Sequence, residues 1–492
     1  MGNHNLTIIF VLINNYPSRA VKTLSLVMSR PQMPLRFLIQ AIFVLFCCTM
    51  FNTATWADTT PQQLSQQAQT NATRDPFKRA RDAQTQAKQN ALPGTDRQPV
   101  AQSPTPTNIE QPANLNGFSY ELGTTIDAFS VTAGGVLNPQ SRDREKESEG
   151  IFGAMDIIAA LDTQTSALWN NGLFYFHSAL TFGKAPAVGD LNGVSNIYAG
   201  KDSFRIIQAW YEHKFTYSHS SFVIGLQDFN NEFYQTAYSK PFLNNGFRVA
   251  KPILEHGKVS TYPLTTLGLR YRSSLTPQSY VQFGVYDSGS SSDALDKVVD
   301  IGLDKKNGVF LISEIGLFKN VPYQSDYYKF AIGLWYLKDD ELGYLVDIDE
   351  SSEHYKYADE PRAGNGGAYL LAEASLGTRA GIFAKHGRAR ETLSRYAEYY
   401  SAGISLKNFI PERDRDIMVL GLVHTRHSDS FMEDNPDKFF TSETVWELSY
   451  AAQVYPWLSI QPDFQYIQRP NMTSPLKQAN TAVIGLRLQA KF

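Results

Sequence analysis

The chain has 492 residues, of which 42% are hydrophobic and 19% charged, and its formal net charge at pH 7 is −3. This nearly neutral balance gives no support to a nucleic-acid partner, which would need a basic surface. The two cysteines, Cys47 and Cys48, both lie in an apolar N-terminal segment, so the remainder of the sequence offers neither a disulfide nor a catalytic thiol.

Residues 1–57 have the pattern of a secretory signal peptide. The basic residues Arg30 and Arg36 precede or open an apolar run that extends over positions 37–51. A small-residue cleavage site follows at positions 54–57 (ATWA). A membrane anchor is the alternative interpretation, but the apolar run is short for a spanning helix.

The start of this segment, residues 1–27, is interpreted as an upstream mis-start, with Met28 or Met33 as the initiator. Removal of residues 1–57 takes away four basic residues and no acidic ones, so the remaining chain carries a formal charge of −7. We therefore expect a protein that leaves the cytoplasm through a cleaved signal peptide.

Residues 58–115 differ in composition from everything that follows. Gln, Thr, Ala and Pro dominate this segment, and aromatic residues are almost missing from it. Such a composition cannot bury enough apolar surface to fold alone. We predict a flexible Gln/Pro-rich periplasmic segment.

Residues 116–492 contain repeated alternation of apolar with polar or small residues. No apolar run there is long enough for a transmembrane helix. The alternation is found at positions 267–272, 280–286, 328–336, 443–454 and 458–466. Side chains of a strand point alternately to its two faces. In a membrane β-barrel only the outward positions need to be apolar, and the 13% of aromatic residues would supply girdles at the two membrane interfaces.

The last twelve residues carry the same pattern to the terminal Phe492. The positions of one parity are apolar: Ala482, Ile484, Leu486, Leu488, Ala490 and Phe492. The positions of the other parity are mostly polar or small: Val483, Gly485, Arg487, Gln489 and Lys491. A soluble amphipathic strand would also explain this segment alone. A barrel strand with its share of turn and loop takes roughly 20–25 residues. The sequence therefore predicts an all-β fold: a transmembrane antiparallel β-barrel of about 16 strands, of the outer-membrane porin type, at residues 116–492, preceded by a disordered tail.

Several segments resemble the carbohydrate-selective porins of the OprB family. They are 209–212 (AWYE), 225–233 (GLQDFNNEF), 242–247 (FLNNGF), 262–272 (YPLTTLGLRYR), 308–316 (GVFLISEIG), 333–336 (GLWY), 413–416 (RDRD) and 460–467 (IQPDFQYI). The resemblance implies a 16-stranded barrel in the bacterial outer membrane through which sugars diffuse passively. This chain departs from the pattern of the family in its long N-terminal segment and in the order Gly246-Phe247, where the family is expected to have Phe-Gly. The constriction loop is therefore expected to differ at this point.

A pore for mono- or disaccharides needs hydrogen-bonding groups, aromatic platforms and a narrow waist. Inward parity selects six strand positions: Trp210, Glu212, Arg270, Arg272, Glu314 and Trp335. A probable lumen-directed loop adds four: Asp228, Glu232, Asn244 and Arg248. Arginines and carboxylates can share sugar hydroxyls while they neutralise each other, and tryptophans can stack on a sugar face. The simpler alternative is that these charges only line a solvated barrel wall.

Other chemistries have little support in the sequence. His424 and His427 are three positions apart, which on a strand places their rings on opposite faces and disfavours a metal site. No nucleotide-binding loop, serine-hydrolase elbow or zinc-protease motif occurs. We therefore expect no enzyme activity, no cofactor and no metal.

Three other classes of function remain as alternatives to a sugar porin. They are a general or other-solute outer-membrane channel, an outer-membrane enzyme, and a secreted β-rich sugar-binding protein. The expected partners are sugars and outer-membrane lipid, and association into a homo-oligomer is left open.

Overall fold

The structure is a computed structural model that describes residues 9–10, 24–25, 117–136, 148–255, 257–288, 296–299, 301, 308–338, 345–348, 355–357, 364–434, 440–472 and 478–492. It divides into two compact units, Met1–Thr73 and Arg74–Phe492. In the first unit, β1 (Ile9–Phe10) pairs antiparallel with β2 (Leu24–Ser25). The predicted cleavage site and the predicted tail at 58–115 lie outside the described residues, so those domain boundaries stay predictions.

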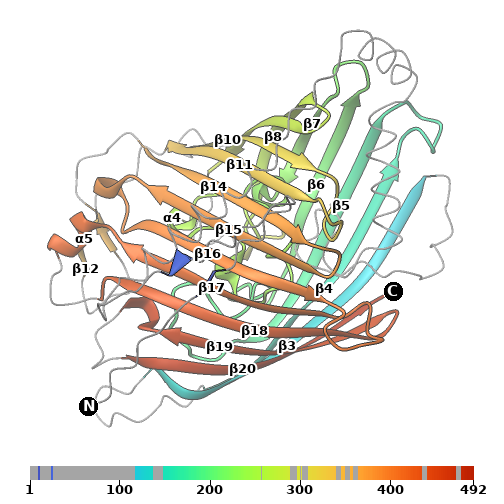
Figure 1. Ribbon diagram of the computed structural model, residues 1–492. Helices are drawn as coiled ribbons and strands as arrows, with labels where there is room; N and C mark the ends of the chain where they lie inside the picture. The colour runs from blue at the N-terminus through green and yellow to red at the C-terminus, as the bar shows by residue number, and fades with distance from the viewer. Residues whose placement is uncertain are drawn as a thin grey trace, which may run out of the picture. The chain divides into compact units, whose positions relative to one another are not determined.

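The second unit contains a closed antiparallel barrel of sixteen strands, which confirms the predicted fold (Figure 1). Successive barrel strands are neighbours, and β20 pairs with β3 to close the cylinder. Closure leaves no barrel strand with an unpaired edge. The strands are β3 (Phe118–Val136), β4 (Glu149–Asp162), β5 (Gly172–Lys184), β6 (Ser203–Phe215), β7 (Ser220–Gln227), β8 (Thr266–Thr276), β9 (Ser279–Asp287), β10 (Val309–Lys319), β11 (Tyr328–Lys338), β14 (Asn365–Leu376), β15 (Ala380–Ala389), β16 (Tyr396–Lys407), β17 (Ile417–His427), β18 (Ser442–Tyr455), β19 (Leu458–Gln468) and β20 (Gln478–Lys491).

The remaining described elements are short. Two small strands, β12 (Leu345–Ile348) and β13 (Tyr355–Tyr357), pair in the connection between β11 and β14. The helical turns are η1 (Phe229–Asn231), η2 (Asn245–Phe247), α4 (Lys251–Leu254), η4 (Glu391–Leu393), α5 (Asp429–Asp434) and η5 (Pro470–Met472). None of the helices among the described residues is long and apolar enough to cross a membrane.

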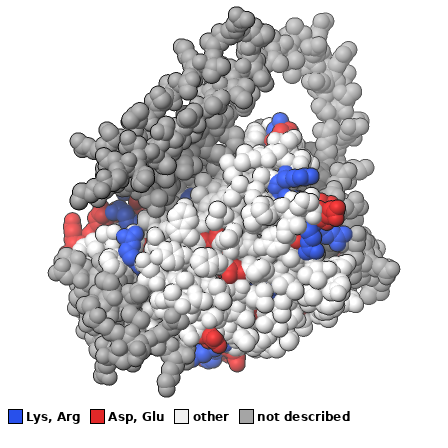
Figure 2. All heavy atoms as spheres, turned by 60° about the horizontal axis from the view of Figure 1, so that its bottom comes forward, with Lys and Arg blue, Asp and Glu red and all other residues white. Residues whose placement is uncertain are grey.

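The two faces of the barrel wall differ as the alternation predicts. In β10, Leu311 and Ile315 are 40% and 50% exposed, whereas Phe310 and Glu314 are 0% and 1% exposed. Large exposed apolar residues recur at alternate positions of most other strands. Figure 2 shows a broad described surface that few charged side chains interrupt. The outer face is therefore an apolar band of the kind that meets lipid.

The C-terminal strand closes the barrel with the predicted parity. Ile484 and Leu486 are exposed on the outer face, whereas Val483 and Arg487 are buried on the inner face. The backbone of Phe492 forms two hydrogen bonds with Leu122: Leu122 N donates to Phe492 O at 3.0 Å, and Phe492 N donates to Leu122 O at 2.9 Å. Backbone pairing thus continues to the last residue.

The connection between β7 and β8 folds into the barrel. We call its described residues, 228–255 and 257–265, the inner loop. Its largest side chains are almost completely buried: Phe229, Phe233, Tyr234, Tyr238, Phe242 and Phe247. They share one apolar cluster with inward residues of the wall from β9 to β20 and of β3 and β4. The hydrophobic core of the barrel therefore lies between the inner loop and this part of the wall.

A second inward segment, residues 185–202, connects β5 with β6. Ser195 donates to Asp127 of β3 at 2.6 Å. Arg487 of β20 donates two hydrogen bonds to the same carboxylate, each 2.7 Å long, and a third to Asn196 at 2.9 Å. Asn196 in turn donates to the Phe242 carbonyl of the inner loop at 2.8 Å. The second segment is thus held between the wall and the inner loop.

Candidate functional site

The inward side chains of the barrel wall differ in burial from one part of the wall to another. Most inward side chains of β9 to β11 and β14 to β19 are buried under the inner loop. Inward side chains that remain partly exposed are found on β4, β6, β7 and β8: Asp156, Trp210, Glu212, Ser221 and Arg272. We call this part of the wall the open side and the part under the inner loop the filled side.

Arg270 of β8 joins the wall to the inner loop at this open side. Its guanidinium lies 3.2 Å from Glu212 of β6 and 3.3 Å from Glu232 of the inner loop. It also donates to the Ser221 hydroxyl at 2.6 Å. The Arg270 side chain is 3% exposed and that of Glu232 is 34% exposed. The carboxylate of Glu232 is therefore the part of this group most open to a solute.

A second ion pair lies within the inner loop itself. Arg248 donates to Asp228 at 2.9 Å, and Asp228 also accepts the backbone N–H of Asn230 and of Tyr262. The guanidinium of Arg248 is 6.0 Å from the centre of the Tyr262 ring, a cation–π distance. Burial raises the pKa of Tyr262 above its ordinary value, and the charge of Asp156 on β4 adds to this effect. The Tyr262 hydroxyl therefore stays neutral beside the open side of the lumen.

An aromatic pair lies on the wall next to Glu212. The rings of Tyr175 on β5 and Trp210 on β6 are stacked, with centroids 4.8 Å apart and planes 16° from parallel. The two residues are direct partners in the strand register. Trp210 and Glu212 are two positions apart, so both side chains point to the same face. The pair presents a flat apolar surface beside a carboxylate.

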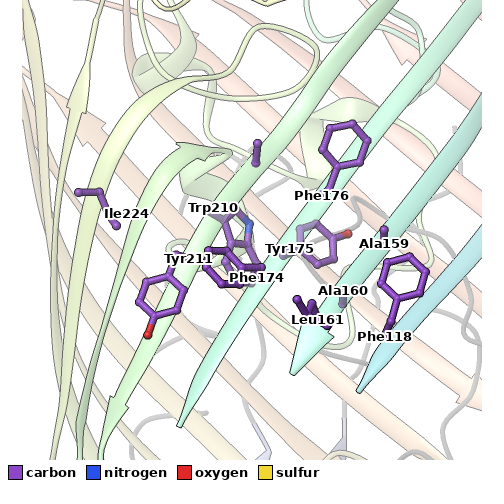
Figure 3. A pocket seen from close by; sticks show the side chains of 11 residues that line it. Phe118, Ala159, Ala160, Leu161, Phe174, Tyr175, Phe176, Trp210, Tyr211 and Ile224 are labelled. Atoms are coloured by element: carbon purple, nitrogen blue, oxygen red, sulfur yellow. The ribbon is translucent and has the colours of Figure 1, made fainter. Parts of the chain in front are cut away.

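The hollow drawn around this pair opens on the other face of the wall (Figure 3). Its lining includes Phe118, Phe174 and Ile224, which are exposed large apolar residues of the outer face. Small residues at Ala159 and Ala209 leave the space between them. Most of its lining therefore belongs to the outer face, and Tyr175 and Trp210 border it from the inner face.

Three expected site residues are almost completely buried, two on the wall under the inner loop and one within the loop. Glu314 and Trp335 point inward, as their parity predicts, but they are only 1% and 4% exposed. Asn244 is fully buried, where it caps η2 by accepting the Gly246 N–H at 2.9 Å. Their burial does not favour direct contact with a solute, which stays a prediction for all three.

Arg272 lies close to the covered region. Its guanidinium is 4.1 Å from the centre of the Tyr280 ring, and it donates to Gln282 at 3.5 Å. The structure thus brings six expected residues together at the open side and its edge. They are Trp210, Glu212, Asp228, Glu232, Arg248 and Arg270.

Residues of β4 and β5 were missed by the sequence analysis. Asp156 accepts a hydrogen bond from Nε2 of His177 at 2.8 Å, and the Tyr175 ring stacks on Trp210. Alternation in these strands would have given their inward parity. Which of these residues meet across neighbouring strands depends on strand register, and parity does not specify the register. Among the described residues, no group of three or more His, Cys, Asp or Glu side chains could hold a metal ion.

The model of one protein family, the carbohydrate-selective porin family OprB, matches residues 146–492. The chain belongs to this family. It is therefore a carbohydrate-selective porin of the bacterial outer membrane, as the sequence resemblance predicts.

Two relatives illustrate how distant the similarity is. The chain is 20% identical over 339 residues to Porin B of Pseudomonas aeruginosa, which covers 62% of this chain and 72% of that protein. Its fold is similar to the high-pH structure of Pseudomonas putida OprB, with a TM-score of 0.64 and 18% identity over 77% of this chain and 94% of that one. At this identity, the structural likeness supports the fold alone.

Proposed function

We propose that this porin selects sugars on the open side of its lumen, at a site formed by Trp210, Glu212 and Glu232, with Arg270 between the two carboxylates. A sugar ring has flat apolar faces and hydroxyl groups that both donate and accept hydrogen bonds. The ring of Trp210 offers a stacking surface, while the carboxylates of Glu212 and Glu232, held by Arg270, offer acceptors. The observation that carries the proposal is the position of Trp210 and Glu212 on one face of β6, with Glu212 3.2 Å from Arg270.

The pairing of charges in the lumen supports a neutral solute. Opposite charges lie together at several places among the described inward residues, including Arg270 with Glu212 and Glu232, Arg248 with Asp228, Lys491 with Glu121, and Arg487 with Asp127. Such groups can hydrogen-bond hydroxyls while their fields largely cancel. A weak site of this kind lets a sugar bind and leave, which passive diffusion requires.

The test is the conductance of the purified protein in a planar bilayer, titrated with a monosaccharide and a disaccharide. The wild-type protein is expected to show an open conductance that falls saturably as sugar is added. In Trp210→Ala the half-saturating sugar concentration should rise about fivefold, which corresponds to about 1 kcal/mol of lost stacking.

A matched control is Trp446→Ala, because Trp446 lies on the outer face of β18 and is 38% exposed. This variant should leave the sugar titration unchanged. Wild-type half-saturation in an open Trp210→Ala channel would remove Trp210 from the site. An open conductance that neither sugar reduces would favour a general solute channel.

A further inference from the structure

Three glutamates of the barrel wall accept backbone N–H groups of the inner loop. Glu314 of β10 accepts from Tyr234 at 3.1 Å. Glu373 of β14 accepts from Ala237 at 2.7 Å and from Tyr238 at 3.2 Å, and Glu447 of β18 accepts from Leu243 at 2.6 Å and from Asn244 at 2.9 Å. Each glutamate is 1% exposed. The contacts follow the loop along the chain, so they hold it at three successive places.

A buried irregular loop needs such partners. A backbone N–H that loses water without a new acceptor costs free energy comparable to a lost hydrogen bond. Loops usually avoid this cost by remaining on the surface. Carboxylates are suited to the task because they only accept and carry two oxygens.

Other wall residues complete the attachment. Lys329, Lys385 and Gln461 donate to the loop carbonyls of Gln235, Phe247 and Pro241, at 2.7, 2.8 and 2.8 Å. Two loop rings also lie over wall glycines. A Cβ at Gly381 would overlap the Tyr238 ring, and a Cβ at Gly403 or Gly421 would crowd the Phe242 ring. The loop thus fits one position against the wall.

The anchored part of the loop lies between the groups that face the open lumen. Glu232 precedes Tyr234 by two residues, and Arg248 follows Asn244 by four. Before the anchored part, Glu232 pairs with Arg270 of the wall. After it, Arg248 pairs with Asp228, which lies at the start of the loop. Any displacement of the anchored part would move these ion pairs relative to Trp210 and Glu212.

We propose that Glu314, Glu373 and Glu447 are positioning residues: they fix the inner loop, and through it the waist and its sugar selectivity, without contacting the solute. The inference rests on the proposed sugar site for one of its two readouts. The other readout, the size and steadiness of the open conductance, is independent of any sugar.

Glutamine substitution separates two of the anchors. In Glu447 each oxygen accepts a different loop N–H, Oε1 from Leu243 and Oε2 from Asn244. Glu447→Gln must therefore turn its own NH₂ group toward one of these donors. In Glu373, Oε2 accepts both loop N–H groups, while Oε1 accepts the Tyr327 hydroxyl at 2.5 Å. Glu373→Gln can keep its oxygen on the loop and donate its NH₂ to the Tyr327 oxygen.

The experiment compares these two variants with the wild type in planar bilayers. Glu447→Gln should open to a larger or fluctuating conductance, and its half-saturating sugar concentration should rise at least fivefold. Glu373→Gln should stay within twofold of the wild type in both readouts. Equal behaviour of the two variants, or wild-type values in Glu447→Gln, would overturn the proposal.

A second variant covers the case in which Glu447→Gln fails to form a barrel. Glu373→Leu removes the acceptor of Ala237 and Tyr238 altogether, and it should reproduce the fluctuating conductance. Wild-type conductance in Glu373→Leu would overturn the proposal, and failure of both variants to insert would assign these residues to folding instead. If the wild type shows no sugar block, the proposed function fails while the conductance readout still decides the role of the anchors.

Discussion

Replacing Arg270 by alanine removes the guanidinium that lies between Glu212 and Glu232. The two carboxylates are 3.2 and 3.3 Å from that guanidinium, so the variant leaves both without this partner at the open side of the lumen. The local charge of the group changes from −1 to −2. A permeating cation should then be favoured and an anion disfavoured.

The size of this effect follows from Coulomb's law. One unit charge acting on an ion about 6 Å away contributes roughly 0.7 kcal/mol in water and roughly 3 kcal/mol at an effective dielectric constant of 20. A water-filled channel lies closer to the first value. Because cation and anion shift in opposite directions, the permeability ratio should rise about tenfold in favour of cations.

The assay is the reversal potential in a KCl gradient at low ionic strength, where screening is weak. Arg388→Ala is a matched control, because Arg388 is exposed on β15 and pairs with Glu391. Arg270→Lys keeps the charge but cannot bridge two carboxylates and a hydroxyl as a guanidinium does. It should preserve the reversal potential and weaken sugar block. An unchanged reversal potential in a folded, conducting Arg270→Ala channel would refute the assignment of Arg270 to the waist.

Two further predictions concern stability. Gly381→Ala places a carbon into the Tyr238 ring and should lower the free energy of unfolding by about 1–3 kcal/mol through overpacking. The control is Gly123→Ala, whose added carbon would be 3.6 Å from Asp156 and should change that free energy little. Equal melting temperatures of the two variants would contradict this prediction. Burial raises the pKa of Glu255 to about 7, although the backbone N–H groups of Arg395 and Tyr396 and the charges of Arg395 and Lys251 oppose the shift. The contribution of Glu255 to the free energy of unfolding is therefore fully present below about pH 4.5 and is lost as the pH rises through 7. The loss amounts to roughly 3 kcal/mol. Glu255→Gln should flatten the melting temperature between pH 4.5 and 8, and an unchanged slope would show that Glu255 does not titrate there.

Strand parity could be predicted because it is a local property. Pro462 illustrates how far the alternation can be trusted: a proline normally argues against a strand, yet it lies on the outer face of β19 opposite Leu486. The parity of Trp210, Glu212, Arg270 and Arg272 likewise followed from their own neighbours. Parity alone also placed Glu314 and Trp335 on the inner face, but it could not tell that they are covered.

The amino-acid sequence by itself determined the barrel, the approximate number of strands, the family and, in the segments that alternate clearly, the direction in which strand side chains point. The barrel and the side-chain directions follow from period-two patterning, which each segment carries within ten or so residues. The strand number follows from the length of chain that each strand uses, and the family from the segments that resemble OprB porins. Only the tertiary structure decided which inward residues meet the lumen. That depends on strand register, because sliding one strand past its neighbour by two residues keeps the same alternation but changes which residues meet. It also depends on the inner loop, whose Tyr238 and Phe242 find their places over Gly381 and Gly403 more than 140 residues later in the chain.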